Sequence, residues 1–293
     1  MPELPDLEAY RHALTARVVG SELRRVVVAH PFVLRTALPP IAAVEGRRVL
    51  AIRRVGKRVA LALDGGLFVV VHLMVAGRLR WLDAGARAPA RNTLAVFEFD
   101  SGRLALTEAG TKRRASIHVV DGEAALAAMD PGGVEPLACD LATFAAILRR
   151  GNHTLKRALT DPASFAGIGN AYSDEILHAA RLSPLALTSR LGDDEIARLH
   201  AATVDVLGRW TATLVDEARR AFPDRVTAFR PEMAVHGRHG EPCPVCGAPV
   251  QRIVYAENEC NYCARCQTGG RVLADRALSR LLKASFPRTL EEP

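Results

Sequence analysis

The sequence lacks long hydrophobic runs, and aromatic residues are scarce. No stretch of about 18 uninterrupted apolar residues is present to span a bilayer, and Phe, Trp and Tyr make up 5% of the 293 residues. No basic segment followed by an apolar one opens the chain, as in a secretory signal. With 49% hydrophobic and 24% charged residues, the composition predicts a globular, cytoplasmic protein with two domains and a small third module.

Acidic residues are too few in the first half of the chain to balance the basic ones. Residues 1–125 contain 19 Lys and Arg against 12 Asp and Glu, a net charge of +7, and the remaining 20 of each sign cancel. The basic residues form clusters at 47–48, 53–54, 57–58 and 112–114. A one-sided positive field is typical of a protein with a polyanionic partner and indicates nucleic acid. A solvated basic surface is the alternative.

Short Val- and Leu-rich runs dominate the first 120 residues, after a helical pattern in residues 7–20. Gly, Pro and Asp turns separate seven such runs: 23–29, 47–55, 58–63, 67–74, 93–99, 103–107 and 116–120. Runs of this length and spacing predict an antiparallel β-sandwich that follows an N-terminal helix.

Beyond the predicted sandwich domain, residues 1–122, the pattern becomes helical. Residues 123–139 are rich in Pro and Gly and are predicted to be a linker, and residues 140–234 contain four stretches with helical spacing. A Cys-, Gly- and Pro-rich module, 235–270, and a helical extension, 271–293, follow. The fold class predicted from these patterns is multi-domain α+β.

Five of the six cysteines lie between Cys243 and Cys266, and the missing secretory signal argues against disulfides. Two Cys-x-x-Cys pairs separated by about 15–20 residues indicate a tetrahedral zinc site. Cys243 and Cys246 form the first pair. We prefer Cys263 and Cys266 as the second, because the spacer of 16 residues has room for a β-hairpin; Cys260 with Cys263 is the alternative. Four thiolates leave no open position, so the zinc is predicted to be structural.

Four separated stretches of the chain resemble the Fpg/Nei family, which comprises formamidopyrimidine-DNA glycosylase and endonuclease VIII. They are MPELPDLEAY, the lysine at position 57, LKRALTDPASFAGIGNAYSDEILHAARLSP, and HGRHGEPCPVCG with YCARCQ. They follow the family's order over nearly the whole chain. The resemblance implies a catalytic β-sandwich, an all-α helix–two-turn–helix domain, a zinc-finger β-hairpin, and base-excision repair of double-stranded DNA that contains damaged bases or abasic sites.

The N-terminus carries the residue types that this chemistry needs. If Met1 is removed, Pro2 begins the chain with a secondary amine, and part of this amine is neutral and nucleophilic at pH 7. Attack on C1′ of a damaged nucleotide would expel the base and form a cationic iminium, which permits strand cleavage by elimination. The resemblance implies that Glu3 is the general acid/base. Asp6 replaces the family's second glutamate and is predicted to support the site.

The resemblance also implies residues that contact DNA. Lys57 would bind a phosphate that flanks the lesion. Asn170, in a Gly-Ile-Gly-Asn turn, would bind a phosphate together with helix N-terminal N–H groups, and Lys156 and Glu175 would support it. Met74 is the candidate wedge that fills the space of an extruded base; a core methionine is the alternative.

Two departures from the family concern residues around the site. In the family, an arginine of the zinc-finger hairpin contacts the phosphate at the scissile position. The matching position of this sequence is Asn258. Arg252 lies in the same predicted hairpin but in another register. A second loop of the family inserts an arginine and a phenylalanine into the base stack. The matching segment of this sequence keeps Arg113 and Arg114, but Ala115 replaces the phenylalanine and cannot fill a base-sized hole.

The leading hypothesis is a monomeric DNA glycosylase and AP lyase with one structural zinc. Oxidised pyrimidines, crosslinks and lesions in single strands remain open as substrates besides oxidised purines. The non-enzyme alternative is a paralogue that binds damaged DNA without processing it. Asn258 favours this alternative, whereas the retained Pro2 and Glu3 argue against it.

Overall fold

The computed structural model describes most of the chain and divides it into two units. The described residues are 1–83, 86, 91–110, 112–224, 226–227, 229–255, 258–273 and 289–290, without the side chains of Tyr255 and Asn258. The first unit comprises Met1–Gly132 with Arg209–Thr227, and the second comprises Gly133–Gly208 with Ala228–Pro293. In the part that is described, no helix is long and apolar enough to cross a membrane. Most of the predicted extension 271–293 lies outside the described residues.

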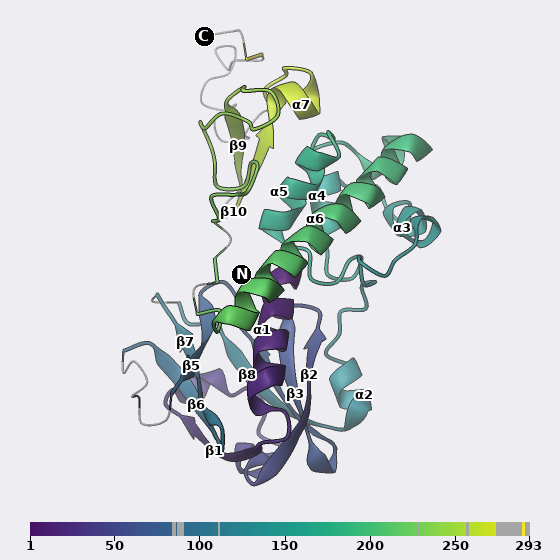
Figure 1. The fold of residues 1–293 in the computed structure, drawn as a ribbon. Helices are drawn as coiled ribbons and strands as arrows, with labels where there is room; N and C mark the ends of the chain where they lie inside the picture. Colours follow the sequence, from purple (N-terminus) through teal and green to yellow (C-terminus); the bar gives the residue numbers. More distant parts are fainter. Residues whose placement is uncertain are drawn as a thin grey trace. The chain divides into compact units, whose positions relative to one another are not determined.

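The first unit consists of helix α1 (Leu4–Val18) and antiparallel strands (Figure 1). The strands are β1 (Glu22–Val28), β2 (Arg47–Val55), β3 (Arg58–Leu63), β4 (Leu67–His72), β5 (Gly77–Leu82), β6 (Thr93–Phe99), β7 (Gly102–Glu108) and β8 (Ser116–Asp121), with short 3-10 turns η1 (Pro31–Val33), η2 (Ile41–Val44) and η3 (Asp64–Gly66). The strands pair in the order β5-β7-β6-β1-β2-β3-β4-β8. The short β1–β2 pairing joins the two halves of this sheet at Glu22 and Leu23.

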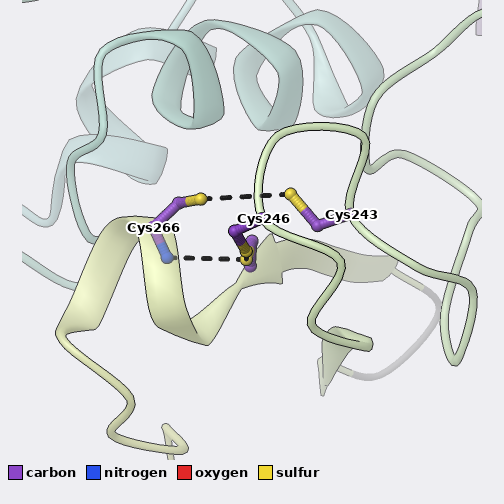
Figure 2. Close-up of side chains that lie close together, drawn as sticks. Cys243, Cys246 and Cys266 are labelled. Atoms are coloured by element: carbon purple, nitrogen blue, oxygen red, sulfur yellow. Dashed lines mark hydrogen bonds between the residues drawn. The ribbon is translucent and has the colours of Figure 1, made fainter.

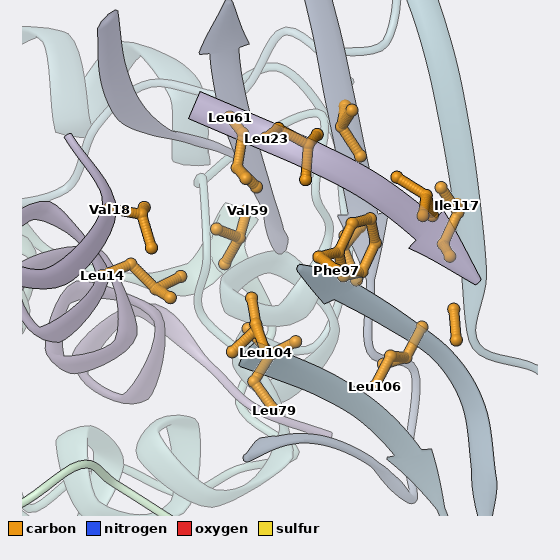
Figure 3. Packing of buried hydrophobic residues seen from close by; sticks show 14 of the residues in the cluster. Leu14, Val18, Leu23, Val59, Leu61, Leu79, Phe97, Leu104, Leu106 and Ile117 are labelled. Atoms are coloured by element: carbon orange, nitrogen blue, oxygen red, sulfur yellow. The ribbon is translucent and has the colours of Figure 1, made fainter. Parts of the chain in front are cut away.

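Both halves of the sheet contribute to one core (Figure 3). Leu23, Phe97 and Leu104 from one half lie in the same buried cluster as Leu61 and Ile117 from the other half. Leu14 and Val18 of α1 belong to this cluster too. Because successive side chains of a strand point to opposite faces, each half turns one face inward, which confirms the predicted β-sandwich.

Two elements of the first unit differ from the sequence prediction. Strand β5 was not among the predicted runs, although Arg78 and Arg80 alternate with apolar residues as in a strand with one solvated face. It lies at an edge of the sheet. Helix α2 (Gly122–Ala127) occupies the start of the predicted linker. Its Leu126 packs with Phe68 and Val70 in a separate small cluster, so burial of this leucine accounts for the helix.

The second unit contains helices and a β-hairpin, as predicted. The elements are α3 (Leu141–Leu148), α4 (Leu155–Thr160), α5 (Asn170–Ala179), η4 (Thr188–Arg190), α6 (Asp193–Arg220), β9 (Val250–Tyr255), β10 (Asn258–Cys263) and α7 (Ala264–Thr268). Asp140 and Thr154 cap α3 and α4 by accepting from backbone N–H groups. Helix α6 continues past Gly208, so its last residues belong to the first unit.

Candidate functional site

Strand register places the predicted DNA-contacting loops of the first unit at one end of the sandwich. Arg58, His72 and Ser116 are neighbours across β3, β4 and β8. The turn before Arg58 carries Lys57, the turn after His72 carries Met74, and the loop before Ser116 carries the predicted arginines. Since these loops adjoin paired residues of neighbouring strands, they lie close together.

Glu3 and Asp6 form a reciprocal cap at the start of α1. The Glu3 N–H donates to Asp6 Oδ2 at 2.9 Å, and the Glu3 side chain accepts from the Asp6 N–H. Both side chains and Pro2 are buried. An N-terminus held in this way has a defined position, unlike a frayed chain end.

The N-terminal amine lies among charged side chains of the first unit. Burial lowers the pKa of the Met1 amine; Glu3 and Asp6 oppose this shift, whereas Arg78 and Lys57 add to it, and the pKa falls below its ordinary value. A lowered pKa increases the neutral, nucleophilic fraction of an amine at pH 7. The fold therefore brings two predicted acids and the predicted lysine near the chain start, and it adds Arg78.

Arg54 links the turn that carries Lys57 to α1. Its Nε donates to Glu8 Oε1 at 2.8 Å, and a terminal guanidinium N–H donates to the Gly56 carbonyl at 3.1 Å. Gly56 has a φ of +55°, a backbone conformation that favours glycine. In the sequence Arg54 is one basic residue among several, and only the fold reveals this link.

The β4–β5 turn exposes an apolar side chain next to Met74. Met74 has a φ of +53° and is half-buried, whereas Val75 is 61% exposed. Arg78 fixes the turn, because its guanidinium donates to the carbonyls of Val75 at 3.1 Å and Gly77 at 2.7 Å. The guanidinium also donates to the Val226 carbonyl at 2.6 Å. Sequence reasoning had not singled out Val75.

His72 lies at the end of β4 in a cationic environment. Burial, together with Arg58, Lys57 and His118, lowers its pKa to about 4. The imidazole is therefore neutral at pH 7 and adds no charge to this end of the sandwich. The sequence analysis assigns His72 no role in the site.

A buried carboxylate orders the loop that carries Arg113 and Arg114. Glu108 is 1% exposed; its oxygens accept from the Arg114 N–H at 3.0 and 2.9 Å and from the Ala115 N–H at 3.0 Å. Both arginine side chains are exposed, whereas Ala115 packs in the main core. The side chain at position 115 is therefore buried in the core.

In the second unit, Lys156 and Asn170 lie next to each other. Lys156 Nζ donates to the Asn170 carbonyl at 2.6 Å and to Asp174 Oδ1 at 2.5 Å. Asn170 begins α5, and its Nδ2 donates to the Glu259 carbonyl at 2.7 Å. Lys156 therefore stabilises the first turn of α5 through these two hydrogen bonds, and Asn170 connects that turn to β10.

Asp174, which sequence reasoning had not singled out, connects several segments of this unit. Its Oδ2 accepts from His236 Nδ1 at 2.8 Å and from the Asn261 N–H at 3.0 Å. Burial alone would raise the pKa of Asp174, but Lys156 and His236 outweigh it, and the pKa lies below its ordinary value. The ionised carboxylate therefore ties α4, α5 and β10 together.

The remaining predicted site residues of the second unit are Glu175, Arg252 and Asn258, and each has its own contacts. The Glu175 carboxylate accepts from the N–H groups of Ala234 at 2.7 Å, Val235 at 2.9 Å and His236 at 2.9 Å, so it orders the segment before the hairpin. On β9, a terminal guanidinium nitrogen of Arg252 lies 3.5 Å from Glu259 Oε2, and the Arg252 side chain is exposed. Asn258 begins β10, but its side chain lies outside the described part of the chain.

Four cysteines of the second unit form a site that fits one zinc ion. The sulfur atoms of Cys243, Cys246, Cys263 and Cys266 all lie within 4.8 Å of one another, and Figure 2 shows how the first, second and fourth converge. Two Sγ–Sγ distances are 3.9 and 3.4 Å. A tetrahedron with Zn–S bonds of about 2.3 Å has sulfur–sulfur edges of about 3.8 Å. The site thus confirms the predicted structural zinc.

The fold also decides between the two cysteine pairings. Cys260 is 1% exposed and packs with Ile253, Tyr262 and Leu273, away from the four-sulfur group. Burial raises the pKa of its thiol above the ordinary value, so it is a core residue. His178 Nε2 lies 3.3 Å from Cys243 Sγ, the position of a hydrogen bond to a zinc-bound thiolate.

Three family models match successive parts of the chain. They describe the N-terminal domain of formamidopyrimidine-DNA glycosylase at residues 1–117, its H2TH domain at residues 133–214, and a zinc finger found in FPG and IleRS at residues 240–269.

Individual relatives cover nearly the full length. Formamidopyrimidine-DNA glycosylase of Variovorax paradoxus is 34% identical over 91% of this chain and 100% of its own. The crystal structure of MutM (Fpg) from Thermus thermophilus matches with a TM-score of 0.77 at 33% identity, over 91% of this chain and 98% of that one. A Lactococcus lactis FPG mutant, in complex with DNA containing Fapy-dG, shares the fold with a TM-score of 0.80 at 24% identity, over 91% of this chain and 100% of that one. Since the similarity extends over both units and the zinc site, this chain belongs to the formamidopyrimidine-DNA glycosylase family.

Proposed function

We propose that this protein removes damaged bases from double-stranded DNA and then cleaves the abasic site, with the amine of Pro2 as the nucleophile. The observation that carries the proposal is the fixed start of the chain: Pro2 is buried directly before the Glu3–Asp6 cap, and the charges of Arg78 and Lys57 act on the same end of the chain. The names of the relatives support a glycosylase.

The proposed reaction begins after removal of Met1. The Pro2 nitrogen bonds to C1′, and the electrons of the broken glycosidic bond leave with the base, which takes up a proton. Opening of the sugar ring gives an iminium, with Glu3 as the proton donor and acceptor. Loss of the C2′ proton then expels the 3′ phosphate and nicks the strand.

The remaining site residues are proposed to hold the DNA and to support the site. Lys57, Arg113 and Arg114 would bind phosphates from the first unit, and Asn170 and Arg252 from the second, with Asn258 at the start of β10 near the scissile phosphate. Met74 or the more exposed Val75 would enter the base stack. Asp6, Lys156 and Glu175 would maintain the geometry.

The proposed location and assembly follow from this function. DNA substrates and a zinc held by reduced thiols suit a monomer of the cytoplasm that associates with the nucleoid. The proposed domains are residues 1–122, 140–234 and 235–270, joined by 123–139 and followed by 271–293. The matched family models cover residues 1–117, 133–214 and 240–269.

Borohydride trapping tests the nucleophile. The purified protein, shown by mass spectrometry to lack Met1, is mixed with an abasic-site duplex and sodium borohydride, which reduces an iminium to a stable adduct. We expect one covalent adduct for the wild type and for Pro40→Gly, a control at an exposed proline. Pro2→Gly should lose most of this adduct while it still binds the duplex.

Two outcomes contradict the proposal. A wild-type protein that binds the duplex tightly without any adduct would be a binding paralogue. An adduct that peptide mapping of the trapped wild type places on a lysine, and not on the N-terminal residue, would show that another amine is the nucleophile. A panel of duplexes with single defined lesions then identifies the preferred base.

A further inference from the structure

The turn between β4 and β5, residues 73–77, has a tightly closed backbone. The Gly77 N–H donates to the Leu73 carbonyl at 2.9 Å, and a Cβ atom at Gly77 would lie 2.2 Å from that oxygen. Met74 has a φ of +53°, which is uncommon for a residue with a side chain. The close approach at Gly77 and the left-handed backbone of Met74 therefore give this turn one defined shape.

The turn holds an apolar side chain in solvent. Val75 is 61% exposed, whereas Leu73 packs in the main core and Met74 is half-buried. A β-branched side chain has few rotamers, so its direction follows from the backbone of the turn. Proteins that unstack bases insert apolar side chains between them, and Val75 is the most exposed apolar side chain of this turn.

One arginine connects the turn to a segment that is distant in the sequence. Arg78 Nε donates to the Val226 carbonyl at 2.6 Å. Its Nη1 donates to the carbonyls of Val75 at 3.1 Å and Gly77 at 2.7 Å. The guanidinium is planar and the directions of its N–H groups are fixed, so these three hydrogen bonds set the position of the turn relative to Val226. A lysine donates from a single nitrogen and cannot reproduce this arrangement.

The segment that contains Val226 is itself anchored in the first unit. Val226 packs in the main core. The nearby Phe222 ring lies with its centroid 5.9 Å from that of Tyr10 and 6.3 Å from that of Trp81. Arg78 therefore attaches the turn to a segment that helix α1 and strand β5 hold in place.

Arg78 also lies close to the start of the chain. Burial lowers the pKa of the N-terminal amine, and the positive charge of Arg78 adds to this shift. The Leu79 N–H donates to the Tyr10 hydroxyl at 3.3 Å, which joins the start of β5 to α1, the helix that begins at the Glu3–Asp6 cap. The turn and the proposed nucleophile therefore belong to one packed group of residues.

We propose that Arg78 is a positioning residue for base extrusion, which holds the β4–β5 turn so that Val75 enters the base stack. Arg78 acts through the carbonyls of Val75 and Gly77, with the Val226 carbonyl as the fixed support. This inference rests on the proposed function, since it requires a nucleotide that leaves the stack.

The emission of 2-aminopurine, which reports its stacking, tests the proposal. The probe is a duplex in which 2-aminopurine adjoins a stable abasic-site analogue on the same strand. Emission is read with the duplex fully bound, so that a loss of affinity does not affect it. The wild type should change the emission because Val75 contacts the probe base. Arg78→Ala should lose most of this change, and its borohydride adduct should form about 100-fold more slowly, the cost of a misplacement of about 1 Å.

Three further variants separate geometry from charge and from stability. Arg78→Lys keeps the charge without the planar set of donors, so it should resemble Arg78→Ala. Val75→Ala shortens an exposed side chain and keeps the carbonyl that Arg78 binds, so it should fold as the wild type does and reduce the emission change. Arg80→Ala is the matched control, because Arg80 is an exposed arginine on the same strand, and it should keep the wild-type emission.

Several outcomes would overturn the inference. It is wrong if Arg78→Ala or Arg78→Lys changes the emission as the wild type does, if Val75→Ala keeps the full change, or if Arg80→Ala loses as much of it as Arg78→Ala. If Arg78→Ala does not fold, the results for Arg78→Lys and Val75→Ala decide in the same way.

The borohydride adduct of the wild type separates this inference from the proposed function. A wild type that binds the probe duplex without a change in emission but forms the adduct refutes the role of Arg78 and leaves the proposed function standing. If the wild type shows neither the emission change nor the adduct, both fail.

Discussion

Replacement of Asp174 should destabilise the second unit and release its zinc. The carboxylate is fully buried and contacts Lys156 Nζ at 2.5 Å, His236 Nδ1 at 2.8 Å and the Asn261 N–H at 3.0 Å. Asp174→Ala would leave the lysine, whose side chain is 13% exposed, as a buried charge without its partner. Because Asn261 lies two residues before Cys263 in β10, loss of its contact also loosens a zinc-bearing strand.

The magnitude follows from the type of contact that is lost. Removal of one partner from a buried ion pair costs about 3–5 kcal/mol, and a buried N–H left without an acceptor costs about 1–3 kcal/mol. Both costs come from the same carboxylate and do not add fully. We therefore expect Asp174→Ala to lower the free energy of unfolding of the second unit by about 3–5 kcal/mol. Asp174→Asn keeps an oxygen acceptor and should lose less. Asp193→Ala is the control, because this carboxylate is 89% exposed and pairs with Arg149 at the surface, a contact worth about 1 kcal/mol or less.

Zinc release during urea titration measures this effect, since it reports on the second unit. Both tryptophans, Trp81 and Trp210, lie in the first unit, so their fluorescence follows that unit separately. We expect Asp174→Ala to release zinc at a lower urea concentration while the tryptophan transition stays unchanged. A zinc-release midpoint equal to those of wild type and Asp193→Ala would refute this reasoning.

Two further predictions concern histidines. Because the pKa of His72 falls from 6.5 to about 4 on folding, the unfolded chain binds more protons than the native one in this window, and stability decreases as pH falls through it. After allowance for partial exposure, this lowers the free energy of unfolding by about 1–2 kcal/mol. In urea titrations followed by tryptophan fluorescence, His72→Gln should reduce the loss of stability between pH 6.5 and pH 4. An equally steep loss would contradict the lowered pKa of His72. His178 Nε2 lies 3.3 Å from Cys243 Sγ, so His178→Ala should weaken zinc binding about 10- to 100-fold, measured in competition with a chelator. The control His153→Ala, at an exposed histidine, should leave zinc affinity unchanged. Equal zinc affinities of His178→Ala and the wild type would show that this contact does not support zinc binding.

The sequence predicted most elements of the fold because their patterns are local. Apolar runs broken by turns marked seven of the strands, and helical spacing marked the helices of the second unit. Strand β5 was missed although its arginines alternate with apolar residues, a pattern typical of a half-exposed strand. Helix α2 was missed because its burial depends on Phe68, which is distant in the chain. Patterns within a short window do not report contacts of that range.

Residue types and spacings by themselves determined the zinc-binding chemistry, the sandwich, the helical second unit, and the likeness to a glycosylase family that focused attention on Pro2 and Glu3. Only the tertiary structure decided that Cys260 is a core residue, that Ala115 faces inward, and that Arg54, Glu108 and Asp174 hold the functional segments. The reason is physical: a carboxylate or a guanidinium acts through whichever groups the fold brings within about 3 Å. Glu8, the partner of Arg54, and the partners of Asp174 lie far away in the sequence, and the contacts of Glu108 depend on the course of the loop that follows it.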